Sequence, residues 1–171
     1  MRTTELSFSE ETPFYKVYID TLGDVELLDI LQRQLHHFPE FIESIPDEKL
    51  LFAYGPDKWT IAQVLVHVID SERIFQYRAL RFSRGDQNSL PGFDQDFYAE
   101  RSKADRRSKE SIIEEYKSVR KSTLALFATF DRDDLENSGT ASHLQWSVAA
   151  LGFVISGHQK HHRDIIRERY L

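Results

Sequence analysis

The chain has 171 residues, of which 40% are hydrophobic and 29% charged, with a formal net charge of −6 and no cysteine. This composition predicts one globular domain over residues 1–171, and it excludes disulfides, zinc–thiolate sites and a cysteine nucleophile. The acidic balance and the shortness of every apolar run lead us to expect neither a nucleic-acid partner nor a membrane. A chain without cysteine or an apolar leader fits the cytoplasm, which is the localisation we expect.

Helical periodicity and capping signals organise the first half of the chain. Residues 1–21 are expected to form an extended lead-in, and a first helix follows at 24–45. A second helix is predicted from Thr60 to about residue 83, because Thr60 and Gln63 form a capping box ahead of an apolar run.

The second half of the chain also shows loop signals and helical periodicity. A loop at 86–96 is long enough to border a pocket, and a short helix is expected at 97–101. Two more long helices are predicted at 108–130 and 146–169, separated by a loop that carries His143. Four long helices with moderately short connections predict an all-α fold, a four-helix bundle.

Two histidines lie on the apolar stripe of the last helix. The stripe recurs in steps of three and four residues: Val148, Leu151, Ile155, His158, His162 and Ile165. Two inward imidazoles one turn apart can hold one metal ion, which removes both the repulsion of charged rings and the lack of partners for neutral ones. A third histidine, His67, lies within the apolar second helix. Spacing alone leaves two interpretations open, a metal site or hydrogen-bonded core histidines.

Other polar residues are candidates for supporting roles. His161 lies about 100° round the helix from His162, on a more polar face, and His143 precedes the last helix; both are accessory candidates beside metal-bound water, and no catalytic side chain is assigned. Asp70 and Glu72 are candidates to orient His67, since metal-bound imidazole usually donates its second N–H to a carboxylate or carbonyl. The motif at 158–162 has zincin spacing, but glutamine replaces the glutamate base, which excludes a zincin protease.

Two segments together resemble the DinB/YfiT-like superfamily: Lys58-Trp59-Thr60-Ile-Ala-Gln-Val-Leu-Val-His67-Val-Ile-Asp70 and Gly157-His158-Gln-Lys-His-His162-Arg163. The resemblance covers roughly residues 24 to 168. It implies a four-helix bundle of up-and-down type, often a homodimer. It also implies a divalent transition metal, nickel or zinc, held by His67, His158 and His162.

A three-histidine site with its fourth position open to water or substrate is the catalytic arrangement rather than the closed structural one. Such a site supports hydrolysis, or S-transfer in which a low-molecular-weight thiol is the cosubstrate. We therefore interpret the chain as a metal-dependent hydrolase or thiol-dependent transferase acting on a small molecule. The alternative is a non-catalytic, metal-stabilised binding or dimerisation module. An anionic cosubstrate needs a cation near the site, and the candidates are Arg78, Arg81, Arg84 and Arg163.

Overall fold

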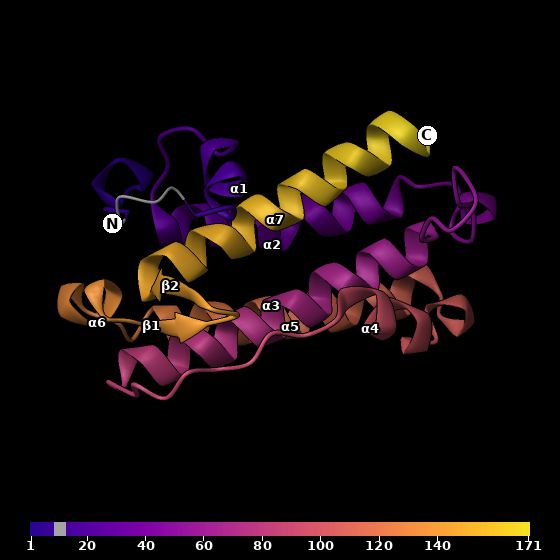
Figure 1. Cartoon of the computed structure of the whole chain (residues 1–171). Coiled ribbons are helices and arrows are strands. Elements are labelled where there is room, and N and C mark those ends of the chain that lie inside the picture. Colours follow the sequence, from indigo (N-terminus) through magenta and orange to yellow (C-terminus); the bar gives the residue numbers. More distant parts are fainter. Residues whose placement is uncertain (9–12) are drawn as a thin grey trace.

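The computed structural model describes residues 1–8 and 13–171 and has four long helices (Figure 1). These are α2 (Leu27–Glu43), α3 (Ile61–Ser83), α5 (Lys109–Phe127) and α7 (Val148–Arg169). The shorter elements are α1 (Lys16–Asp20), α4 (Gln95–Arg101), α6 (Arg132–Glu136), the strands β1 (Ser138–Ala141) and β2 (Leu144–Ser147), and the 3₁₀ turns η1 (Thr3–Glu5), η2 (Asp47–Lys49) and η3 (Ala104–Arg106). The predicted all-α class and four-helix bundle are confirmed, with helix ends within three residues of expectation. No helix among the described residues is both long and apolar enough to cross a membrane.

The start of α3 shows how local sequence fixes a helix. Thr60 Oγ1 accepts a hydrogen bond from the Gln63 backbone N–H at 3.2 Å, and Gln63 Oε1 accepts one from the Thr60 N–H at 2.9 Å. This reciprocal capping box satisfies two groups that the first turn cannot pair internally. The predicted helix start is therefore confirmed, and it sets the position of His67 along α3.

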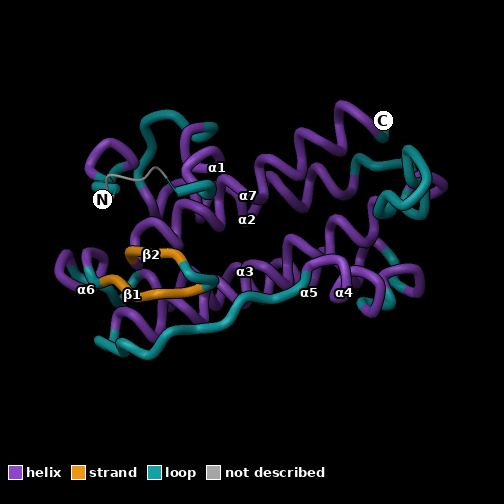
Figure 2. The backbone as a smooth tube through the Cα atoms, viewed as in Figure 1, coloured by secondary structure: helices purple, strands orange, loops and turns teal. Residues whose placement is uncertain are grey.

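The four long helices form a square in which α2 and α3 each contact α5 and α7. The segment at 86–94 runs back along the bundle, so α3 and α5 begin at the same end and run parallel (Figure 2). At the far end of α7, the Tyr170 hydroxyl donates to the Trp59 carbonyl just before α3, at 2.8 Å. Helices α3 and α7 are therefore antiparallel, and their middles face one another.

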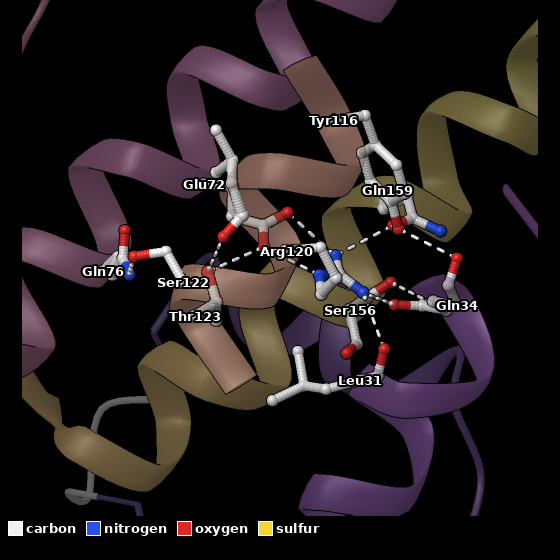
Figure 3. Close-up of polar contacts among 11 residues, drawn as sticks. Leu31, Gln34, Glu72, Gln76, Tyr116, Arg120, Ser122, Thr123, Ser156 and Gln159 are labelled. Carbon is white, nitrogen blue, oxygen red and sulfur yellow. Dashed lines mark hydrogen bonds and ion pairs between the residues drawn. The ribbon is translucent and has the colours of Figure 1, made fainter. Parts of the chain in front are cut away.

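A buried arginine links all four helices (Figure 3). Arg120 on α5 is completely buried, and its guanidinium group has five N–H donors. The acceptors are Glu72 Oε1 and Oε2 on α3 at 2.7 and 2.9 Å, Gln159 Oε1 on α7 at 2.9 Å, and Gln34 Oε1 and the Leu31 carbonyl on α2 at 3.0 and 3.3 Å. Every donor of this buried cation is satisfied, which is the condition under which a charge is tolerated in a core.

The sequence prediction was wrong in two places. The lead-in contains α1 rather than extended chain alone, and the loop before the last helix is a β-hairpin that includes Trp146 and Ser147. The hairpin turns on Ser142 and His143, both in the left-handed region with φ of 52° and 64°, as a two-residue turn requires. Leu90 pairs with the hairpin through backbone hydrogen bonds to residues 140 and 142. The two strands pair with each other across this short turn, and helical periodicity does not predict such a pairing.

Candidate metal centre

Helices α3 and α7 bring the three predicted histidines together. His67 Nε2 lies 3.1 Å from His158 Nε2, and His162 Nε2 lies 3.0 Å from the same atom. All three ligand atoms lie within 4.8 Å of one another. The i,i+4 spacing on α7 gives one edge of this triangle, and the antiparallel packing of α3 supplies the third corner.

Burial keeps these imidazoles neutral. His67 and His158 are buried and His162 is half-buried. Burial lowers the pKa of His67 to about 4, and burial together with repulsion from His67 and His161 lowers the pKa of His162 to about 3. The pKa of His158 is also well below its usual value, first because of burial and then because of the neighbouring histidines. Each ring therefore has an unprotonated nitrogen at neutral pH, which is the form that binds a metal.

The donor set fits a divalent transition metal. Nitrogen–metal bonds of about 2.0–2.1 Å place neighbouring tetrahedral ligand atoms roughly 3.3 Å apart. Two of the nitrogen–nitrogen distances, 3.0 and 3.1 Å, are close to this edge. No carboxylate belongs to the cluster that the described residues form, and three imidazoles suit zinc or nickel rather than calcium or magnesium.

The two carboxylates predicted to orient His67 do not contact it. Glu72 is bound to Arg120 and also accepts from Thr123 Oγ1 at 2.8 Å. Asp70 is half-buried and lies 3.5 Å from Arg73. Both predictions were wrong because Asp70 and Glu72, three and five residues after His67, lie on the side of α3 that meets α5, whereas His67 lies on the side that meets α7.

Aromatic rings and a close backbone contact fix the histidines in place. The Trp59 ring lies 4.8 Å from the His67 ring, and the Tyr18 ring lies 5.4 Å from the His158 ring. Gly157 allows this second contact, because a Cβ atom at that position would lie 2.2 Å from the Tyr18 carbonyl oxygen. A glycine next to a candidate ligand thus permits α1 to cover α7.

The remaining histidines lie outside the triangle. His161 is half-buried, with its ring 5.2 Å from both the Tyr18 and the His162 rings, and burial lowers its pKa. His143 is exposed at the tip of the hairpin. His36 and His37 are exposed on α2.

The triangle opens into a cavity of about 180 Å³. Its lining is mainly aromatic, with a few polar groups: Phe14, Tyr15, Tyr18, His67, Ser71, Phe75, Arg78, Phe93, Gln95, Ser142, Trp146, Val154 and His158. The predicted role of the 86–96 loop as a pocket border is confirmed by Phe93 and Gln95. A second cavity of about 230 Å³ reaches His162 from another side, and Gln95 lines both.

Of the four candidate arginines, only Arg78 lines the cavity that holds His67 and His158. Arg81 pairs with Asp86, Arg163 lies 2.8 Å from Asp164, and Arg84 is exposed. The sequence reading missed Ser71, which lies one turn after His67 on α3. Its spacing from His67 is the signal that indicates a place on the same face.

Comparisons with known proteins agree with this geometry. Residues 30–166 match the family described as the DinB superfamily. A curated protein of Oceanobacillus iheyensis, described as a candidate metal-dependent hydrolase, is 30% identical over 81 residues. The match takes in 46% of each chain, so this chain spans about half the length of that relative. The solved structure of YfiT from Bacillus subtilis, described as a candidate metal-dependent hydrolase with an unusual four-helix bundle topology, has a TM-score of 0.73 at 16% identity. It covers 96% of this chain and 91% of its own, and at this identity the likeness shows the fold.

Proposed function

Since the chain belongs to the DinB superfamily, we propose that it is a metal-dependent hydrolase whose divalent ion is held by His67, His158 and His162. The observation that supports this most is the convergence of three neutral imidazole nitrogens at the edge of a cavity. A structural site would be closed by a fourth side chain, whereas among the described residues only three ligating groups meet here. The fourth position is left for water or substrate.

The chain's own residues perform three tasks in this proposal. The histidines hold the ion, which supplies a Lewis acid and brings the pKa of a bound water toward neutrality. The aromatic walls exclude bulk water and bind an apolar substrate body, which strengthens electrostatic interactions inside the cavity. His161 is half-buried beside His162, which makes it a better accessory proton carrier than the exposed His143.

Thiol S-transfer is the second candidate, and one observation favours it. Two cavities reach the triangle, one beside His67 and His158 and the other beside His162. A reaction with two organic substrates needs two such approaches, whereas hydrolysis needs one approach and water. Nickel and zinc are both compatible with imidazole ligands, and the same proposal covers either ion.

Metal analysis of four single variants tests the ligand assignment. Replacing His67, His158 or His162 by alanine leaves two ligands, so metal content measured by mass spectrometry after purification should fall sharply. The His161→Ala variant is the matched control and should retain its metal. If His161→Ala empties the site while His162→Ala leaves it filled, the assignment is wrong.

A substrate screen then separates the two reactions. The metal-loaded protein is offered ester and amide substrates alone, and thiol–electrophile pairs in parallel. Hydrolysis without added thiol that disappears in His158→Ala supports the hydrolase. Turnover that requires the thiol supports transfer, and no turnover of either class in metal-loaded protein favours the non-catalytic module.

A further inference from the structure

Arg78 is a buried cation with which no described carboxylate forms an ion pair. The residue is 3% exposed. Its two hydrogen bonds both come from Nη2, to the Pro91 carbonyl at 3.1 Å and Ser142 Oγ at 2.9 Å. Both acceptors are neutral. A charge in such a place is costly unless something balances it.

Two nitrogens of Arg78 remain available to a ligand. Nε and Nη1 donate to no described residue. Among the described residues, Ser71 Oγ and Ser156 Oγ are the only fully buried side-chain polar atoms without a partner. Nε and Nη1 therefore keep accessible surface, and Arg78 lines the cavity in which that surface lies. A planar guanidinium edge of this kind matches a carboxylate in both geometry and charge.

Arg78 and His67 lie along the same face of α3. Eleven residues separate His67 from Arg78, close to three turns at about 3.6 residues each, with a rise of about 16 Å. Phe75 bridges the gap: its ring lies 5.8 Å from the Arg78 guanidinium carbon and 6.1 Å from the His158 ring. One small molecule lying over Phe75 can therefore reach both ends of the cavity.

The cavity also holds a polar group that the fold leaves unused. Ser71 is 1% exposed, and its hydroxyl has no hydrogen-bond partner among the described residues. It lies between His67 and Phe75 on α3 and lines the same cavity. An orphaned buried hydroxyl costs free energy unless a ligand pairs with it. It marks a position where a polar substituent of the ligand would sit.

We infer that this cavity binds an organic carboxylate: the anionic group pairs with Arg78, an apolar body lies against Phe75 and Trp146, and the reacting group faces His67 and His158. Among the described residues of the lining, Arg78 is the single arginine or lysine and none is acidic, so one negative charge balances the site. Which end reacts rests on the proposed function, whereas the carboxylate site rests on Arg78 alone.

The test is binding to the full-length protein after removal of metal by a chelator, so that a carboxylate cannot bind through the ion. The probes are 4-phenylbutyrate and its neutral amide, and affinity is measured by calorimetry. Wild type should bind the acid at least tenfold more tightly than the amide. Equal affinity for the two probes, or no binding of either at millimolar concentration, overturns the inference.

Three variants distinguish recognition of the carboxylate by Arg78 from a purely structural role of Arg78, which holds the hairpin through Ser142. In Arg78→Gln the affinity for the acid should fall to the affinity for the amide, and the affinity for the amide should not change. Arg78→Lys should restore part of the preference for the acid. Arg81→Gln, on the same helix but outside the cavity, is the control and should keep the full preference for the acid. A preference that survives in Arg78→Gln overturns the inference.

A nitrogen NMR measurement covers the case in which Arg78→Gln does not fold. In wild type, the Arg78 Nε resonance should shift with the acid and not with the amide, and an unmoved resonance overturns the inference. Metal content does not enter any of these measurements. Failure of the histidine assignment would therefore leave the carboxylate site standing, and the reverse holds too.

Discussion

Replacing Glu72 by leucine removes the only carboxylate among the described residues that pairs with the buried Arg120. The pair is bidentate, and the side chains are 2% and 0% exposed. Burial acts to lower the pKa of Arg120, and the Glu72 carboxylate together with Tyr116 outweighs burial and raises that pKa. Arginine is protonated in proteins because its intrinsic pKa is very high, so the guanidinium keeps its charge in the Glu72→Leu variant and has only neutral acceptors.

Breaking one side of a buried ion pair costs about 3–5 kcal/mol. Domains of this kind have free energies of unfolding of roughly 5–15 kcal/mol, so Glu72→Leu should remove a large part of the stability. For a chain of this length the melting temperature should fall by roughly 6–20 °C. The double variant Glu72→Leu/Arg120→Met should lose less than Glu72→Leu alone, because it leaves no unpaired charge.

Urea unfolding followed by circular dichroism measures both free energies, and an unchanged slope confirms that the same surface is exposed. Glu114→Ala is the control, since Glu114 makes an exposed pair with Lys117 and its loss should change little. A loss below about 1 kcal/mol for Glu72→Leu would refute the reasoning. So would a double variant less stable than either single variant.

Three further outcomes are expected. The metal-free protein should lose stability as pH falls from 6.5 toward 4, because His67 in the unfolded chain binds a proton that folded His67, with a pKa of about 4, does not. His67 alone should account for a loss of about 3 kcal/mol in the free energy of unfolding. A urea series in which the free energy of unfolding does not change over this pH range would contradict the prediction. Gly157→Ala should destabilise by about 1–3 kcal/mol by forcing Tyr18 away, whereas Gly55→Ala, whose Cβ meets only a side-chain atom at 3.7 Å, should not. We also expect a homodimer through exposed apolar helix faces, so sedimentation at micromolar concentration should show twice 20.1 kDa, and Leu80→Glu should lower it if that face is buried.

The helices and the histidine triangle were predictable because their signals are local and periodic. The capping box at Thr60 needs three residues, and the stripe that places His158 and His162 needs one helix. Placing His67 in the triangle required a further inference, that α3 packs against α7 with His67 at the level of His158 and His162. The periodicity of α3 predicted its burial, and the packing of two apolar faces then left few places for a buried imidazole.

The missed features have two different causes. Glu72 was predicted to orient His67, but its partner Arg120 lies 48 residues away on a helix that the crossover at 86–94 makes parallel to α3. That interaction is set by chain topology, which neither periodicity nor spacing within one element specifies. The hairpin is local, but its turn places Ser142 and His143 at positive φ, where glycine or asparagine would have been the recognisable signal.

Two buried arginines differ in how their charges are balanced: one is neutralised by the fold, and the other is available to a ligand. Arg120 has acceptors for all its donors and a carboxylate for its charge, and it joins the four helices. Arg78 is almost as buried, but among the described residues it has two neutral acceptors and no carboxylate, and it lines a cavity that two of the three histidines also line. A helical bundle gains no stability from an unbalanced buried charge. The charge that stabilises the fold is neutralised within the chain, and the charge left unbalanced is the one that a ligand can neutralise.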